Sequence, residues 1–284
     1  MIKYLVIGDP VAHSRSPNMQ NAAFSACGFG KPYGIRRVTA EELPGFFEYA
    51  RKNLLGVNIT VPHKTAAAQL ADSLTERAAL CGSVNTLIIK DGHITGDSTD
   101  GVGLERALQS NFGIDVSAKT ILFLGAGGAA RATSIHFAMQ KCAKIIFANR
   151  TLANAQILAD EIAALPGNTT ECQVIPIADQ KAVRTALAEA DILIQATSLG
   201  LKESDPPPFE LELLKDCGKL YIFDTIYRKT PLLQYADALG IPAVGGKEML
   251  VQQGAASFEI WTGIKPPLDK MEEGFELPPG GVEA

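Results

Sequence analysis

The chain is poor in the residues that build metal centres and disulfide frameworks. Its 284 residues include four histidines and five cysteines. The number of cysteines is odd and no two of them form a C-x-x-C pair, so we expect neither a disulfide framework nor a structural zinc site, and we assign no metal. We interpret the thiols as buried apolar groups. They are Cys27, Cys81, Cys142, Cys172 and Cys217.

The chain also lacks an excess of basic charge and any long apolar run. Its formal net charge is -5 at pH 7, which argues against a nucleic-acid partner. Small anionic substrates stay possible, because local basic residues decide their binding. No stretch approaches the roughly 20 apolar residues of a membrane helix, and the apolar run in the opening MIKYLVIGDP is too short for a secretory signal. We therefore expect a cytoplasmic protein without a membrane partner.

Short β-branched runs alternate with alanine-rich stretches along most of the chain. Hydrophobic residues make up 46% of the sequence and charged residues 20%, which is enough apolar material for real cores. Strands that alternate with helices predict an α/β protein with mainly parallel sheets. The expected strands are 4–7, 57–61, 84–89, 120–124, 144–148, 173–177, 191–196 and 220–224, and the clearest helices are 129–140 and 152–165.

We expect two domains with a boundary near Asp100. Residues 1–99 form the first α/β unit, and residues 100–245 form the second. A helix over 247–262 follows the last strand, and we expect the segment 246–284 to pack back on the first domain. The tail from Lys265 is rich in proline, glycine and glutamate, which predicts a poorly ordered or lightly docked C-terminus.

A glycine fingerprint opens the second unit. The strand 120–124 is followed at once by G-A-G-G-A-A and then by a helix. Gly125 permits the tight turn, Gly127 lets the backbone approach a pyrophosphate, and Ala130 keeps the helix close to the strand. The helix N-terminus supplies N–H donors to the phosphates. This predicts a Rossmann-type dinucleotide site at Gly125, Ala126, Gly127, Gly128 and Ala129; the alternative is a tight turn without a ligand.

The end of the next strand bears on the choice of cofactor. It reads Asn149-Arg150-Thr151, where an NAD enzyme usually has an acid for the ribose 2′-hydroxyl. Arg150 can pair with a 2′-phosphate and stack on the adenine, and its two neighbours can donate hydrogen bonds. We therefore predict NADP(H) as the cofactor; the alternative is a solvent-exposed arginine at a strand end.

Two polar clusters follow first-domain strands, where α/β proteins bind ligands. In His13-Ser14-Arg15-Ser16-Pro17, Ser16 is expected to cap a helix, and the two hydroxyls can form a carboxylate site. In N-I-T-V-P-H-K, alternation places Asn58 and Thr60 on one face of a strand. Lys64 then begins a helix, where its amine can exchange a proton with a substrate. The alternative for Lys64 is an ordinary surface lysine.

A third cluster combines S-V-N-T with G-D-S-T-D-G. It contributes Asn85 and Asp100, and a carboxylate at Asp100 could pair with Lys64 and orient it. The alternative role for Asp100 is to cap the helix that follows, over residues 101–112.

The order of these motifs resembles that of the shikimate dehydrogenases, from about Gly8 to Gly263. The motifs are H-S-R-S-P, N-I-T-V-P-H-K, S-V-N-T, T-D-G, G-A-G-G-A-A-R, N-R-T and Q-G-A-A-S-F-E-I-W-T-G. The resemblance implies a substrate-binding and catalytic domain and an NADP-binding domain, with a cleft between them. It implies the reversible reduction of 3-dehydroshikimate to shikimate, a step of aromatic amino-acid biosynthesis.

The resemblance also implies roles for individual residues. Lys64 matches the general acid/base, and Asp100 matches its partner. The remaining matches are Ser14, Ser16 and Tyr227 for the substrate carboxylate, Asn58, Thr60, Asn85 and Gln253 for its hydroxyls, Asn149, Arg150 and Thr151 for the 2′-phosphate, and Thr197 and Gly246 for further cofactor contacts.

Some positions depart from the family pattern and leave alternatives open. Asn154 stands where many members carry a second arginine, so the clasp for the 2′-phosphate is weaker by one charge. Gln195 stands where asparagine often begins the motif. A shikimate/quinate dehydrogenase with dual cofactor use is one alternative, and a non-catalytic sensor of cofactor and metabolite is another. The presence of Lys64 and Asp100 argues against the sensor. We expect a monomer or a homodimer.

Overall fold

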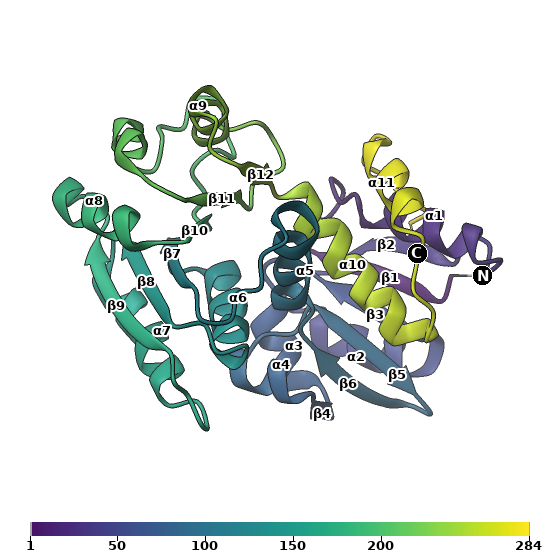
Figure 1. Cartoon of the computed structure of the whole chain (residues 1–284). Coiled ribbons are helices and arrows are strands. Elements are labelled where there is room, and N and C mark those ends of the chain that lie inside the picture. The colour runs from purple at the N-terminus through teal and green to yellow at the C-terminus, as the bar shows by residue number, and fades with distance from the viewer. Residues whose placement is uncertain (1, 284) are drawn as a thin grey trace. The chain divides into compact units, whose positions relative to one another are not determined.

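The computed structural model describes residues 2–283 and divides the chain into two compact units (Figure 1). Unit 1 joins the segment up to Gly103 to the segment from Leu250 onward, and unit 2 comprises Leu104–Met249. The helix α5 (Asp100–Phe112) contains the first division point, and α10 (Lys247–Thr262) contains the second. Both units are α/β, as the sequence predicts.

Unit 1 contains a six-stranded mixed sheet in the order β2-β1-β3-β5-β6-β4. The pairs β1–β2, β1–β3 and β4–β6 are parallel, whereas β5 runs antiparallel to both of its neighbours. The sequence analysis missed β2, β4 and β6. The strands are β1 (Tyr4–Gly8), β2 (Tyr33–Arg37), β3 (Gly56–Ile59), β4 (Ser73–Leu74), β5 (Thr86–Lys90) and β6 (His93–Asp97).

Helices cover both faces of this sheet. Alternation along β1 sends Leu5 and Ile7 into one core and Tyr4 and Val6 into the other. The first core is closed by α2 (Leu43–Asn53), α3 (Lys64–Leu70) and α4 (Glu76–Cys81), and the second by α1 (Ser16–Ala26), α10 and α11 (Leu268–Glu276).

Unit 2 contains a six-stranded sheet that is parallel throughout, in the order β12-β11-β10-β7-β8-β9. This is the Rossmann order, with the direction of winding reversed between β7 and β10. The strands are β7 (Thr120–Leu124), β8 (Lys144–Asn149), β9 (Glu171–Pro176), β10 (Ile192–Gln195), β11 (Tyr221–Asp224) and β12 (Ala243–Gly245). The helices are α6 (Gly128–Met139), α7 (Leu152–Ala163), α8 (Gln180–Glu189) and α9 (Pro231–Leu239), with a 3-10 turn at Leu211–Asp216.

The prediction of a loosely docked C-terminal tail is wrong. Residues from Leu268 form α11, which packs against α1 and buries Met271 and Phe275. The chain then runs along β2, where Ile35 pairs in parallel with Glu283. The glycine content of the tail indicated disorder, but Gly274 permits close packing of α11 on α1. A Cβ at this position would lie 2.6 Å from the carbonyl oxygen of Asn18.

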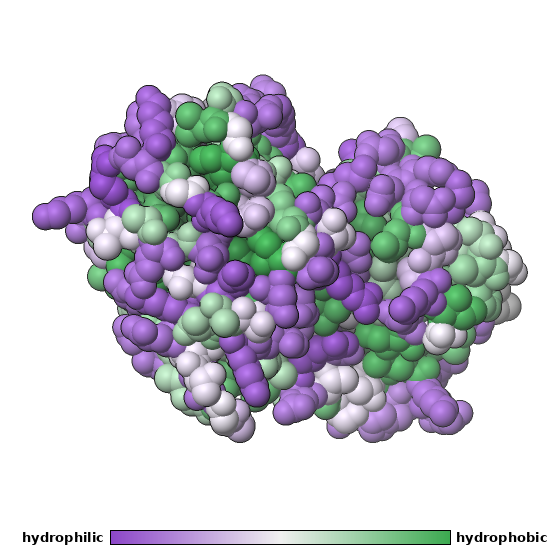
Figure 2. All heavy atoms as spheres, in the orientation of Figure 1, coloured by the Kyte–Doolittle hydropathy of each residue, from purple (hydrophilic) through white to green (hydrophobic). Residues whose placement is uncertain are grey.

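The surface mixes hydrophilic and hydrophobic side chains on both units in the view of Figure 2. Among residues 2–283, no helix is long and apolar enough to cross a membrane. Of the five cysteines, Cys81 and Cys142 are buried and the other three are half-buried. Burial raises the pKa of Cys142 to about 11, which keeps its thiol protonated and unreactive.

An ion pair fixes the turn from β6 into α5. Both nitrogens Nε and Nη2 of Arg77 donate to Asp97, at 2.7 and 2.6 Å, and the Thr75 hydroxyl donates to the same carboxylate at 2.6 Å. Burial raises the pKa of Asp97, but hydrogen bonds from Arg77 and Thr75 outweigh this and hold the pKa below its ordinary value. Asp97 also accepts from the Ser98 N–H and so orders the start of the turn.

Replacing Gly56 by alanine should destabilise unit 1. The added Cβ would lie within 2.8 Å of three atoms of the Trp261 indole, whose N–H donates to the Leu87 carbonyl. We expect a loss of about 1–3 kcal/mol, typical of overpacking, measured by urea unfolding. Gly45→Ala is the matched control, since its Cβ meets nothing within 4 Å and should stabilise the helix by about 0.4–1 kcal/mol. Equal effects at the two positions would contradict the packing argument.

Arg77→Ala should destabilise the protein in a pH-dependent way. Removing the cation leaves the Asp97 carboxylate buried without a charge partner, which costs about 3 kcal/mol at pH 7. Because the folded pKa of Asp97 is lowered, its contribution is present above the unfolded pKa of about 3.9 and is lost as pH falls through the folded pKa.

The unfolding free energies of wild type and of Arg77→Ala should therefore converge as pH falls through the lowered folded pKa of Asp97. Arg37→Ala, which breaks the exposed pair with Asp9, is the control and should change stability little. A difference for Arg77→Ala that stays constant with pH would assign its effect to packing instead of charge.

Candidate functional site

The sheet of unit 1 gathers polar segments at one edge. The parallel strands β1 and β3 both end there, since Ile7 lies opposite Ile59. The antiparallel β5 begins at this edge, with Thr86 opposite both Asn58 and Asp97. The segments that leave β1, β3 and β6, and the one that enters β5, therefore meet. These segments carry Ser14, Ser16, Thr60, Lys64, Asn85 and Asp100.

Lys64 and Asp100 form the charged centre of this edge. Lys64 is the first residue of α3, as predicted, and Asp100 is the first residue of α5. The amine Nζ donates to Oδ2 of Asp100 at 2.5 Å. The side chain of Asp100 is 9% exposed and that of Lys64 is 29% exposed. The carboxylate is thus buried behind an amine that solvent or a ligand can still reach.

Asn85 holds the other oxygen of the same carboxylate. Its Nδ2 donates to Oδ1 of Asp100 at 2.8 Å and lies 3.3 Å from Oε1 of Gln253. Its Oδ1 accepts from the backbone N–H of Thr99 at 2.8 Å and from the Thr86 hydroxyl at 2.9 Å. Asn85 therefore ties β5, the β6–α5 turn and α10 together around Asp100.

Asn58 was predicted to bind the substrate, but its side chain is more deeply buried than that role requires. Its Oδ1 accepts from the Tyr33 hydroxyl at 2.7 Å, and its Nδ2 reaches the Ser257 and Thr86 hydroxyls at 3.1 and 3.3 Å. It is 6% exposed. These contacts use most of its hydrogen-bonding capacity, so its present contacts anchor α10 to the sheet. Thr60 lies just beyond the strand and is half-buried.

The two serines lie at the start of α1. Ser16 is the first helical residue, and Arg15 is the N-cap without a side-chain hydrogen bond. The prediction that Ser16 caps the helix is therefore wrong. Instead, Oγ of Ser14 accepts from the N–H of Ser16 at 3.3 Å, which satisfies a free donor of the first turn. As an acceptor there, the Ser14 hydroxyl keeps its proton for another partner.

Gln253 completes the polar edge from α10. Its Nε2 donates to the Leu250 carbonyl at 2.8 Å, which aims Oε1 at Asn85. The structure thus brings together four predicted residues: Lys64, Asn85, Asp100 and Gln253.

In unit 2 the glycine fingerprint has the geometry of a phosphate loop. Gly125 has φ +100°, and a Cβ there would lie 2.9 Å from Cγ2 of Thr197. Gly127 precedes α6 without a side-chain cap. Gly127 and Gly128 are exposed, and a Cβ at either would meet nothing within 4 Å. The open space and the uncapped N–H groups fit a bound pyrophosphate.

The end of β8 presents Arg150 to solvent. Asn149 turns its Nδ2 to the carbonyl of Thr151 at 2.8 Å, and Thr151 precedes α7. Arg150, Thr151 and Asn154 are exposed. No acidic side chain follows the strand within 149–154, so nothing there repels a 2′-phosphate.

Gln195 is a site-shaping residue that the sequence analysis did not assign. It is buried at the end of β10, where its Oε1 accepts from the Thr197 N–H and its Nε2 donates to the Leu199 carbonyl, both at 2.7 Å. It thereby folds the loop that packs against Gly125. The sequence did carry a signal for this role, because Gln195 is a polar residue directly after the apolar run 192–194.

A buried carboxylate organises the loop that carries Tyr227. Asp224 accepts from the Ile226 N–H at 3.0 Å and from the Thr230 hydroxyl at 2.6 Å, and burial raises its pKa. Gly246 donates its N–H to the Ile226 carbonyl at 3.0 Å. The structure places Tyr227, 57% exposed, in unit 2, and the serines in unit 1.

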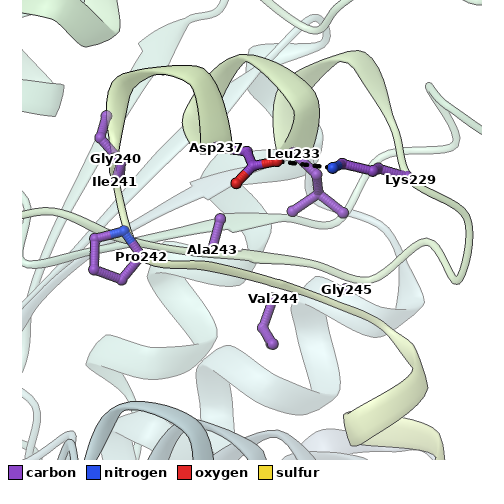
Figure 3. A pocket seen from close by; sticks show the side chains of 9 residues that line it. All are labelled: Lys229, Leu233, Asp237, Gly240, Ile241, Pro242, Ala243, Val244 and Gly245. Atoms are coloured by element: carbon purple, nitrogen blue, oxygen red, sulfur yellow. Dashed lines mark hydrogen bonds and ion pairs between the residues drawn. The ribbon is translucent and has the colours of Figure 1, made fainter.

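A separate pocket of about 500 Å³ lies between α9 and β12 (Figure 3). Lys229 and Asp237 form an ion pair of 2.8 Å on its α9 side. None of the predicted site residues lines it. Within residues 2–283, no group of three or more histidine, cysteine or acidic side chains could hold a metal ion.

Comparison with known proteins matches this geometry to one family. Family models match over three segments: shikimate dehydrogenase substrate binding domain (residues 6–87), shikimate / quinate 5-dehydrogenase (106–202) and shikimate 5'-dehydrogenase C-terminal domain (246–273). A shikimate dehydrogenase (NADP(+)) of a Geobacter species is 38% identical over 272 residues, which is 94% of this chain and 92% of the relative.

Solved structures agree. Shikimate 5-dehydrogenase of Listeria monocytogenes, in complex with shikimate and NAD, superposes with a TM-score of 0.89 at 34% identity and covers 96% of both chains. The enzyme of Thermus thermophilus, in complex with NADP(H) and shikimate, gives 0.85 at 33% identity, over 97% of this chain and 98% of its own. With this identity along nearly its whole length, the chain belongs to the shikimate dehydrogenase family.

Proposed function

We propose that this protein reversibly reduces 3-dehydroshikimate to shikimate with NADPH, through Lys64 and Asp100. The observation that carries the proposal is the 2.5 Å contact between a reachable amine and a buried carboxylate. Family membership and NADP-dependent relatives support the reaction and the cofactor. We further propose that unit 1 binds the substrate, that unit 2 binds the cofactor, and that the protein acts in the cytoplasm as a monomer or homodimer.

Lys64 is suited to move the proton of the reaction. Reduction of a ketone places negative charge on its oxygen, and an ammonium group at hydrogen-bond distance can donate a proton to that oxygen. In the reverse direction the neutral amine accepts the proton from the alcohol. Asp100 fixes the position of Nζ, and Asn85 keeps the carboxylate from turning.

The neighbouring polar groups are suited to orient a cyclic polyhydroxy acid. Ser14 and Ser16 offer hydroxyls at a helix N-terminus, which favours a carboxylate. Thr60 and Gln253 present donors and acceptors beside Lys64 for the ring hydroxyls. Asn58 acts as a support beneath them through its contacts with Tyr33 and α10.

The backbone and side chains at the strand ends of unit 2 are suited to bind NADPH. Bound NADPH supplies the hydride. Its pyrophosphate would be held by the backbone of Gly125, Ala126, Gly127, Gly128 and Ala129, which is open at Gly127 and Gly128. Gly125 rests against Thr197, whose loop Gln195 shapes. Arg150, with Asn149 and Thr151, would hold the 2′-phosphate, and Gly246 would make a further cofactor contact through its backbone. A Cβ at Gly246 would collide with the carbonyl oxygen of Thr225.

Quinate is a second substrate to test, because a matching family model covers shikimate and quinate enzymes. Quinate has an extra hydroxyl on the carbon that bears the carboxylate, so the end of the site at Ser14 and Ser16 must accommodate it. Steady-state assays with both substrates and both cofactors compare these options directly.

Lys64→Ala should lower kcat about 10²- to 10⁴-fold, the usual contribution of a general acid. The KM for shikimate should change much less, because the carboxylate and hydroxyl contacts remain. Lys90→Ala, an exposed lysine at the end of β5, is the control and should keep wild-type kinetics. An unchanged kcat in Lys64→Ala would remove this residue from the chemistry.

Arg150→Ala should raise the KM for NADP+ about 10- to 100-fold, the value of a lost charged hydrogen bond. The KM for NAD+, which lacks the 2′-phosphate, should stay near its wild-type value. Arg184→Ala removes an exposed arginine of α8 that pairs with Asp216 and serves as control. Equal losses with both cofactors would mean that Arg150 stacks on the adenine and does not read the phosphate.

A further inference from the structure

We propose that the C-terminal segment, residues 274–283, positions the loop that carries Ser14 and Ser16, with Arg15 as the positioning residue. The inference rests on the proposed function, in which these two serines hold the substrate carboxylate. It gives a task to a part of the chain that lies far from the loop in sequence and contributes no predicted site residue.

Arg15 stands between the two serines, but its guanidinium is committed to the C-terminal segment. Its Nη1 donates to the carbonyls of Phe275 and Leu277 at 2.7 and 2.8 Å. Its Cζ also lies 4.9 Å from the centroid of the Phe275 ring. These carbonyls end α11, where a helix has unpaired acceptors and a negative dipole end. The arginine therefore caps α11 and is held by it.

The residues after Ser16 are held by the same segment. Asn18 donates its Nδ2 to the Pro278 carbonyl at 2.7 Å. A Cβ at Gly281 would lie 2.7 Å from Cβ of Pro17, so the tail backbone passes directly over the first turn of α1. The loop is thus fixed on both sides of Ser16 by backbone and side-chain contacts with one segment.

The C-terminal segment is itself anchored at both ends. At one end, Phe275 is buried in the same core as Met19 and Met271. At the other end, Ile35 of the edge strand β2 donates its N–H to the Val282 carbonyl at 3.0 Å. A segment fixed at both ends can hold the loop in one conformation, which lowers the ordering cost of binding a carboxylate.

The competing explanation is that Arg15 binds the substrate carboxylate directly. An arginine between two carboxylate-binding serines would suit that role. Its two carbonyl partners and the aromatic ring argue against it, because swinging the guanidinium away would leave the end of α11 uncapped. Truncation after Glu276 separates the two explanations. It removes the Leu277 carbonyl that Arg15 contacts and the tail contacts to Pro17 and Asn18, while Arg15 itself stays.

The test compares wild type with Arg15→Ala, a chain that ends at Glu276, and the two changes combined. Each is assayed with shikimate and with its methyl ester, which lacks the carboxylate charge. Arg51→Ala is the matched control: Arg51 also donates to a carbonyl, that of Gly92, and to Asp72, in the same unit but on α2. Ser14→Ala tests the carboxylate assignment itself.

We expect Arg15→Ala and the truncation each to raise the KM for shikimate about tenfold, and to change the KM for the ester and for NADP+ less than about twofold. Both therefore lower the preference for the free acid. The combined variant should be no worse than either alone, since both changes break one coupled contact. Arg15→Lys should restore part of the preference, and Arg51→Ala should keep all of it.

The inference would be overturned by a truncated enzyme that keeps the wild-type preference while Arg15→Ala loses it. Additive losses in the combined variant, or equal losses on acid and ester, would also overturn it. Where Arg15→Ala does not accumulate as folded protein, Arg15→Lys and the truncated chain give the same comparison. If Ser14→Ala leaves the preference intact, the carboxylate assignment fails. If Ser14→Ala loses the preference for the free acid but the Arg15 and truncation variants keep it, the positioning role fails.

Discussion

The structure of unit 1 depends on satisfying the buried carboxylate of Asp100. A charge at that depth is tolerated only when both oxygens have strong partners. Lys64 satisfies one oxygen and Asn85 the other. Asn85 can do so because its own carbonyl is occupied by Thr99 and Thr86. The orientations of α3, α5 and the start of β5 follow from this arrangement.

The same polar network extends beneath the reactive groups to α10. The Ser257 hydroxyl lies 2.8 Å from that of Thr86 and accepts from Asn58 at 3.1 Å. Gln253, one turn earlier on the helix, approaches Asn85. A fully bonded network of this kind is rigid, so Lys64, the proposed proton donor, rests on a support that does not have to rearrange.

The sequence predicted those parts whose signals are local. The strand, turn and helix around Gly125 and the helix that begins at Lys64 follow from turn residues, a proline and periodicity. The structure confirms these elements and the helix 247–262. The prediction that Lys64 pairs with Asp100 also holds. Lys64 follows β3, whose apolar pattern is visible in the sequence. Asp100 follows β6, which the sequence analysis missed, and was selected for its place at the expected domain boundary.

Other parts depended on contacts distant in sequence. The strand β2 reads YGIRR and is recognisable only through its partners β1 and the tail. The hairpin of β5 and β6 did have a local signal, the Asp91-Gly92 pair, where both residues have positive φ. In the tail, the spacing of Met271 and Phe275 by four residues indicated an amphipathic helix, which the proline and glycine content obscured. The deep position of Asn58 depends on Tyr33 and Ser257, which no local pattern connects.

The bond from Arg15 to Phe275 spans 260 positions of the chain, and this has a consequence for biosynthesis. A ribosome releases the N-terminus first, so the loop with Ser14 and Ser16 emerges long before the residues that hold it. Unit 2 is one continuous segment, so it can fold as soon as its last strand has been made. Unit 1 must wait until the C-terminal segment has been made, so the unit that carries the proposed catalytic residues completes its fold after unit 2.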